Sequence, residues 1–193
     1  KLNNMEYCKE CVYPYAAVNL MVDDDGVCSS CQSFKAFESI SEESWKEKRE
    51  KLIEIINPIK EKNKSNYDCL IPVSGGKDSY FQIHCIVKDL GLKPLLVTYD
   101  GNNFLPEGVY NRDRMKLNFD ADHITWAPSV EVLKKLNRLG FKKMGDMNWH
   151  NHCGILTSPI SIAEKFKIPI IIWGEVNWDI SGMFDPNDFV EFS

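Results

Sequence analysis

The sequence predicts an α/β domain, in which helices flank a parallel sheet, with a small appendage before it that holds four cysteines. Three observations predict this class. From residue 67 onward, short apolar runs alternate with helix-like segments, the order expected of a parallel sheet with crossover helices. These runs are nearly continuous, as in strands buried on both faces. Residues 1–36 carry four of the seven cysteines, in two pairs, and show little periodic pattern.

The first predicted helix covers residues 41–64, where apolar residues recur at helical spacing from Trp45 to Ile59. Ser39, followed three residues later by Glu42, predicts a capping box at its beginning. The chain is therefore expected to comprise a four-cysteine module, an amphipathic linker helix and an α/β domain. Their predicted boundaries are residues 1–36, 37–66 and 67–193.

The elements of the α/β domain follow from apolar runs and from the glycines and prolines between them. Gly91 and Gly140 are predicted to end two of the helices. Because parallel sheets bind ligands beyond the carboxyl ends of their strands, functional residues are expected at those ends. Strands are predicted over 68–73, 94–99, 121–126 and 168–173, and helices over 79–90, 107–118, 129–139 and 158–166.

The charge and hydropathy of the sequence disfavour two classes of function, nucleic-acid binding and membrane insertion. The net charge of −5 and a pI of about 5.4 disfavour nucleic acid as a partner, because such binders usually present a basic face. The densest basic run, residues 46–64, is interleaved with glutamates and is typical of a solvated helix face. No apolar stretch reaches membrane-spanning length, and no secretory signal opens the sequence. A cytoplasmic enzyme with a small-molecule substrate is expected.

A glycine-rich loop follows the first predicted strand. The two glycines let the backbone approach an anion closely, and the following helix adds the positive end of its dipole. The serines can donate hydroxyl hydrogen bonds, Lys77 adds a charge, and Asp78 can cap the helix or help to hold a divalent cation. A glycine turn without a ligand is the alternative. The loop reads Ser74-Gly75-Gly76-Lys77-Asp78-Ser79.

This loop matches the SGGxDS signature of the PP-loop ATP pyrophosphatases and differs in length from the loop of P-loop NTPases. The resemblance implies an adenine nucleotide alpha hydrolase-type domain that binds ATP with Mg²⁺. The loop would hold the departing pyrophosphate while AMP passes to an acceptor. Asp100, at the end of the second predicted strand, is a candidate contact for the nucleoside, or a loop aspartate in a turn.

Two CxxC pairs, Cys8 with Cys11 and Cys28 with Cys31, are separated by sixteen residues. This spacing can present four thiolates tetrahedrally, as structural Zn²⁺ prefers. Four protein ligands leave no open position, so the ion is expected to be structural. Two disulfides are the main alternative, which a cytoplasmic location disfavours, and an iron–sulfur or redox role is another.

Two later segments supply further candidates. Residues 145–154 predict a polar, aromatic loop, in which Asn148, His150 and His152 are candidate substrate contacts, with a metal site or a structural role as alternatives. Glu175 follows the last predicted strand and is expected to face the phosphate loop. We assign catalytic roles to Lys77, Asp78 and Glu175, the last as a Mg²⁺ ligand or as a contact to the acceptor.

The order of four motifs along the chain resembles that of the N-acetyl sugar amidotransferases. These motifs are the cysteine pairs, the phosphate loop, Asn148-Trp149-His150 and Trp173-Gly174-Glu175. These PP-loop enzymes make acetamidino sugars for bacterial surface polysaccharides and flagellar glycans. The resemblance implies adenylation of the N-acetyl group of a sugar or nucleotide sugar, and then attack by ammonia from a separate glutaminase subunit. PP-loop sheets commonly have five strands and members of this family are longer, so a truncated chain is expected.

Two alternatives remain open at this point. A tRNA-thiolating PP-loop enzyme would combine cysteine pairs with a basic face and a catalytic cysteine, for which Cys153 is the candidate. A non-enzymatic zinc-ribbon adaptor would bind nucleotide without turnover, although the intact phosphate loop argues against it.

Overall fold

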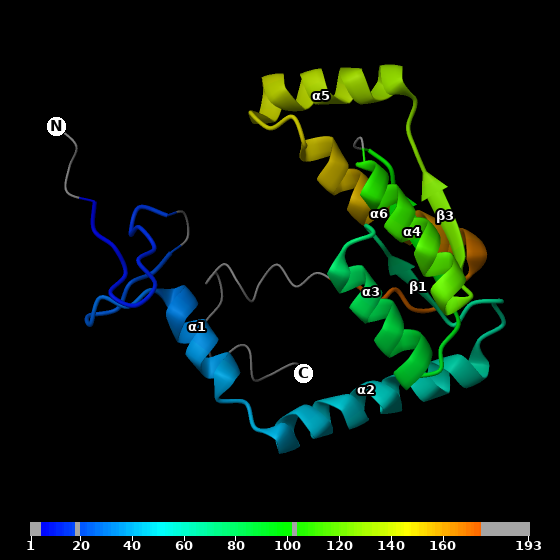
Figure 1. Ribbon diagram of the computed structural model, residues 1–193, viewed down its shortest axis with the longest axis horizontal. Helices are drawn as coiled ribbons and strands as arrows, with labels where there is room; N and C mark the ends of the chain where they lie inside the picture. Colours follow the sequence, from blue (N-terminus) through cyan, green and yellow to red (C-terminus); the bar gives the residue numbers. More distant parts are fainter. Residues whose placement is uncertain (1–4, 18–19, 102–103, 175–193) are drawn as a thin grey trace. The chain divides into compact units, whose positions relative to one another are not determined.

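The computed structural model describes residues 5–17, 20–101 and 104–174, and the ribbon in Figure 1 shows their helices and strands. Within them the chain forms two compact units, one over residues 5–52 and the other over Ile53–Gly174. The division falls inside helix α2 (Glu42–Lys62), whose two ends therefore belong to different units.

The first unit contains the four cysteines and a helix that the sequence pattern does not predict, α1 (Ser29–Glu38). This helix begins directly after Cys28. Ser39 ends it, because its amide donates to Lys35 and Ala36 and its hydroxyl donates to the Ala36 carbonyl. The predicted capping box is therefore wrong: α2 begins instead with the Ser41 hydroxyl, which accepts from the Ser44 amide at 3.1 Å.

The second unit is built on a parallel sheet of three strands, in the order β1 (Cys69–Pro72), β2 (Pro94–Tyr99) and β3 (Asp122–Trp126). In the register of this sheet, Leu70 lies beside Leu95, and Leu95 beside Asp122. The strand predictions for these three segments are confirmed to within two residues at each end.

The fourth predicted strand is reduced to a single contact on the free edge of β1. Leu70 donates its amide to the Ile170 carbonyl and accepts from the Ile172 amide, each at 2.9 Å, which makes a parallel bridge between Leu70 and Ile171. Pro169 has no amide hydrogen to extend a ladder. The segment 170–172 nevertheless lies beside β1, on the side opposite β2.

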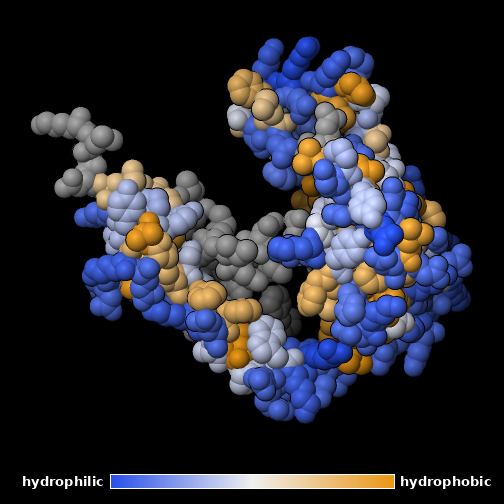
Figure 2. Space-filling model, viewed as in Figure 1, coloured by the Kyte–Doolittle hydropathy of each residue, from blue (hydrophilic) through white to orange (hydrophobic). Residues whose placement is uncertain are grey.

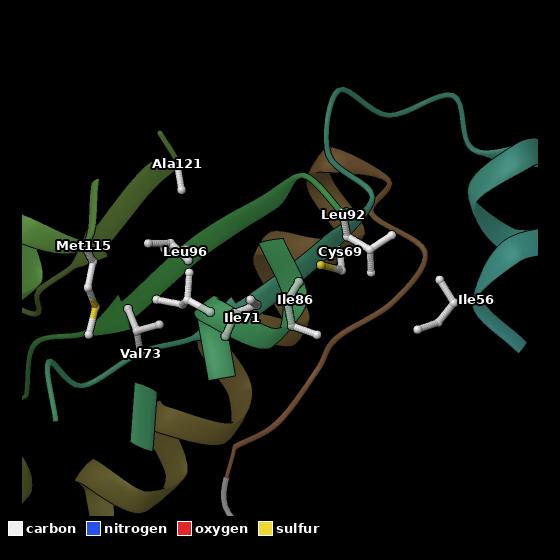
Figure 3. Close-up of a cluster of buried hydrophobic side chains, with 10 residues drawn as sticks. Ile56, Cys69, Ile71, Val73, Ile86, Leu92, Leu96, Met115 and Ala121 are labelled. Carbon is white, nitrogen blue, oxygen red and sulfur yellow. The ribbon is translucent and has the colours of Figure 1, made fainter. Parts of the chain in front are cut away.

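Helices cover both faces of this sheet. The first face carries α3 (Lys77–His84), its π-helical continuation η1 (Cys85–Asp89), α4 (Pro106–Phe119) and the end of α2. Its side chains form the cluster in Figure 3, where Ile71 and Leu96 from the strands meet residues of these helices. The other face packs Leu70, Leu95 and Val97 against Ala163 of α6 (Trp149–Phe166). An α/β sheet flanked by helices is therefore confirmed.

Two helix boundaries differ from the prediction by five residues or more. Gly140 does not end α5 (Val130–Met144), since Gly145, with φ of +70°, does. Gly140 is instead buried where the chain crosses the helix, and a Cβ there would lie 2.6 Å from the Asp146 carbonyl oxygen. Helix α6 begins at Trp149, so most of the predicted loop 145–154 is helical. Its first turns are polar and lack the apolar period that would reveal a helix.

Candidate functional site

The phosphate loop lies at the point where the sheet changes its direction of growth. From β1 the chain adds β2 and β3 on one side, and it later places segment 170–172 on the other side. In open α/β sheets, ligands bind in the crevice beyond the carboxyl ends of the strands at such a switch point. The loop begins directly beyond β1, and Trp173 and Gly174 follow the bridge segment.

Short hydrogen bonds hold the loop in shape. The Ser79 hydroxyl accepts from the Ser74 amide at 3.1 Å, and the two hydroxyl oxygens lie 3.3 Å apart. The Gly76 amide donates to the Ser74 hydroxyl at 3.4 Å, and Gly76 is the N-cap of α3. Ser79 is buried whereas Ser74 is exposed. The loop therefore wraps the N-terminus of α3, where amides and the helix dipole favour an anion.

Gly75 is the residue at which the loop requires glycine. Its φ is +90°, which side-chain-bearing residues rarely adopt. A Cβ on Gly75 would also lie 2.8 Å from the Gly108 carbonyl oxygen and 3.0 Å from Arg112 Cγ, both in α4. The loop is thus seated directly on the following helix.

The charged residues of the loop face solvent. Lys77 Nζ lies 2.8 Å from Asp78 Oδ1, and the two side chains are 89% and 77% exposed. An exposed pair of this kind contributes little to stability, so both groups are available to a ligand. Lys77 and Asp78 occupy the first turn of α3, which begins two residues before the predicted start of this helix at residue 79.

Asp100 lies directly after β2, and its amide donates to the Trp126 carbonyl at 2.8 Å. Its carboxylate Oδ2 lies 3.5 Å from Nη1 of Arg112, whose side chain is only 8% exposed. The Arg112 guanidinium also stacks 4.2 Å from the ring centre of Phe104. Sequence reasoning missed Arg112, because an arginine inside a predicted helix belongs to no motif.

A second buried contact connects β3 to the root of the loop. The Thr98 hydroxyl donates to the Val73 carbonyl at 2.7 Å and lies 2.9 Å from His123 Nε2. Burial, followed by the charge of Arg112, lowers the pKa of His123 to about 4. The ring is therefore neutral at pH 7, and its Nε2–H can donate to Thr98. Sequence reasoning missed this contact too, since it joins three separate strand segments.

The candidate substrate residues at the start of α6 lie in different environments. His150 is buried and its Nε2 lies 2.7 Å from Asn137 Oδ1, which ties α6 to α5. His152 and Asn148 are exposed, and the Asn148 amide donates to Asp146 Oδ1 at 2.7 Å. His150 therefore joins two helices, whereas the other two remain accessible to a ligand.

The same helix reaches the carboxyl end of β2. A Cβ on Gly154 would lie 2.3 Å from the Tyr99 ring, and one on Gly101 would lie 2.6 Å from Asn151 Oδ1. The buried Asn151 therefore lies over the corner that follows Asp100, a position that sequence analysis did not single out. Glu175, the remaining candidate, lies outside the described residues.

The four cysteines of the first unit converge. Their Sγ atoms all lie within 4.8 Å of one another, with Cys8 and Cys31 at 3.9 Å and Cys11 and Cys28 at 3.6 Å. A tetrahedron of Zn–S bonds has edges of about 3.8 Å. The spacing is compatible with ligation of a metal by the four thiolates.

The backbone around this cluster is arranged for thiolates. Amides of Glu10 and Cys28 donate to Cys8 Sγ at 3.4 and 3.3 Å, and backbone hydrogen bonds lower the pKa of Cys8 to about 6. Burial raises the pKa values of Cys28 and Cys31. A cation would therefore favour the thiolate forms of Cys28 and Cys31. The four cysteines could hold a metal ion.

The helices of the described residues include none that is long and apolar enough to cross a bilayer.

Comparison with solved structures finds the U34-tRNA thiolase NcsA from Methanococcus maripaludis with its 4Fe-4S cluster, at 12% sequence identity and a TM-score of 0.42. The similarity covers 89% of this chain and 54% of that one, so the chain spans about half the length of that protein. No protein-family model matches the chain, and no curated protein matches it.

Proposed function

We propose that the second unit binds ATP at the Ser74–Ser79 loop and cleaves it between the α- and β-phosphates. The observation that carries this proposal is the place of the loop at the switch point of the sheet, wrapped around the N-terminus of α3. Backbone amides of the loop and the exposed Lys77 would neutralise the departing pyrophosphate. Asp78 would orient Lys77 or help to hold a Mg²⁺ ion that accompanies the nucleotide.

The acceptor that we propose is the N-acetyl group of a sugar or nucleotide sugar. Its amide oxygen attacks the α-phosphorus, the bond to the bridging oxygen breaks, and pyrophosphate leaves. Ammonia then adds to the imidate carbon, AMP departs with the oxygen, and a proton is released, which leaves an acetamidine. The chain's part is positioning and charge neutralisation, with His152 and Asn148 as exposed candidates for substrate contacts. The ammonia would come from a separate glutaminase, in the cytoplasm.

The four-cysteine cluster supports structural Zn²⁺ in the same protein. Four thiolates would complete the coordination of a tetrahedral Zn²⁺ ion, so the ion would supply folding energy to its module and would offer no open position to a substrate. Of the four ligands, Cys8 and Cys28 are buried and Cys11 is exposed.

The experiment that tests the acceptor is release of pyrophosphate from ATP and Mg²⁺ with a panel of N-acetylated nucleotide sugars and ammonia. Release and AMP formation that depend on one sugar support the proposal. The Lys77→Ala variant is expected to lose this release, whereas Lys88→Ala, an exposed lysine at the end of the same helix, is expected to keep it. Nucleotide binding without turnover under every acceptor would support a non-enzymatic adaptor instead.

A second candidate, tRNA thiolation, is favoured by one feature of α5. Five basic side chains are exposed on this helix against a single glutamate, Glu131, in an otherwise acidic protein. Figure 2 shows hydrophilic residues over much of α5. Cys153, in the second turn of α6, would be its candidate thiol carrier and is half-buried. Pyrophosphate release that depends on tRNA, and on no sugar, would establish this alternative. The five basic residues are Lys134, Lys135, Arg138, Lys142 and Lys143.

A further inference from the structure

Arg112 is a buried cation that contacts both halves of the proposed nucleotide site. Its aliphatic stem lies against the phosphate loop, since a Cβ on Gly75 would come within 3.0 Å of its Cγ. Its guanidinium lies 3.5 Å from the Asp100 carboxylate, beyond the neighbouring strand. The residue therefore connects the loop that follows β1 to the acid that follows β2.

The surroundings of the guanidinium leave it incompletely satisfied. Nη1 is buried without a hydrogen-bond partner of good geometry among the described residues, and one face of the group stacks on Phe104. Burial of a charged pair is weak support for stability, because apolar side chains of similar volume often stabilise a protein as well or better. The buried charge of Arg112 therefore suggests an electrostatic role rather than a purely stabilising one.

Asp100 supplies the reason for such a role. Its side chain is 29% exposed, so one edge of the carboxylate remains open at the end of the sheet that carries the loop. A carboxylate there can accept hydrogen bonds from nucleoside hydroxyl or amino groups. Left unpaired, however, the same negative charge would repel the polyphosphate at Ser74–Ser79.

We propose that Arg112 is a positioning residue that neutralises Asp100, so that this acid can bind the nucleoside of ATP without repelling the phosphates. The inference rests on the proposed ATP site. In this proposal Asp100 contacts the ligand. Arg112 does not contact the ligand and acts by neutralising the charge of Asp100. Packing alone would make Arg112 equally important for ligands with and without phosphates.

The test is calorimetric titration of the full chain with Mg²⁺–ATP and with adenosine, on the wild type and on R112M, D100N and the double variant. R112M is expected to raise the Kd for ATP about tenfold, the effect of one uncompensated charge near the phosphates at an effective dielectric of about 20. Its Kd for adenosine should change by less than about twofold. Adding D100N to R112M removes the exposed charge and should restore ATP affinity to that of D100N alone.

A matched control and a second variant accompany this series. Arg114 lies two residues along the same helix and is exposed, so R114M should leave both affinities unchanged. R112K keeps the charge if R112M does not fold, and ATP affinity within about threefold of the wild type is then expected.

The outcomes separate the inference from the proposed function. Equal weakening of ATP and adenosine by R112M, an absence of rescue by D100N, or a tenfold loss of ATP affinity in folded R112K would each overturn the role of Arg112. Those results leave ATP binding by the wild type intact. If the wild-type chain binds neither ATP nor adenosine, the ATP site itself is refuted.

Discussion

Replacement of Gly75 by alanine tests whether the phosphate loop is shaped as the structure shows. Gly75 has φ of +90°, and the added Cβ would lie 2.8 Å from the Gly108 carbonyl oxygen. The left-handed backbone costs an L-residue about 1–2 kcal/mol. Overlap with a backbone oxygen cannot be relieved by a change of rotamer, so either the loop or α4 must move, which adds about 1–3 kcal/mol. We expect a total loss of about 2–5 kcal/mol.

The matched control is Gly91→Ala. Gly91 has φ of +61° but has no atom within 4 Å of an added Cβ, so this variant tests the backbone term alone. It is expected to lose about 1–2 kcal/mol and to leave the loop in place. The effect of alanine on the unfolded chain is the same in both variants and cancels in the comparison.

The assay combines urea unfolding of the full chain with titration of ATP. Gly75→Ala should be the less stable variant and should bind ATP at least about tenfold more weakly, because the displaced amides no longer converge on the phosphates. Gly91→Ala should bind ATP as the wild type does. If Gly75→Ala is no less stable than Gly91→Ala and binds ATP normally, the packing of the loop on α4 is wrong.

The remaining predictions concern the phosphate loop, the metal cluster and a buried histidine. Lys77→Ala should lower pyrophosphate release by about 100-fold or more while stability stays within about 0.5 kcal/mol, with Lys88→Ala as the control for both measurements. Cys28→Ser should lower the zinc content, measured by atomic absorption, from about one ion per chain to nearly none, and a retained ion would contradict the four-thiolate site. Between pH 6.5 and about 4 the unfolded chain binds a proton at His123 that the folded protein does not. Stability should therefore be full above pH 6.5 and fall by about 2 kcal/mol as the pH drops to 4, after allowance for partial exposure of the ring. His123→Gln should remove this part of the fall in urea unfolding at pH 7 and 4.5, and an unchanged pH dependence would contradict the burial of His123.

The sequence indicates β1 and β2 well because burial on both faces leaves a direct composition signal, whereas the predicted strand over 168–173 is reduced to a single bridge. The run from Pro94 to Tyr99 is wholly apolar apart from Thr98, and all six of its residues are buried. Helix boundaries are harder to predict where polar residues are buried against neighbouring elements. His150 and Asn151 lie on the buried side of α6, and nothing in their local sequence distinguishes them from loop residues.

The candidate site shows the same division between local and long-range information. The phosphate loop and each cysteine pair are short contiguous motifs, so a sequence is enough to propose them as sites. Arg112 and His123 act through contacts with Asp100 and Thr98, which are distant in sequence or lie on neighbouring strands. The local pattern of a single sequence does not show which distant residues will be in contact. These contacts are therefore seen only in the folded structure.

The most direct test of the central claim is to identify the products of ATP by ³¹P NMR while the full chain turns over with Mg²⁺, ammonia and its acceptor. Cleavage between the α- and β-phosphates predicts AMP and pyrophosphate in equal amounts, both lost in Lys77→Ala. Formation of ADP and orthophosphate instead would show cleavage at the γ-phosphate, and would contradict the assignment of the Ser74–Ser79 loop as a pyrophosphate-binding site.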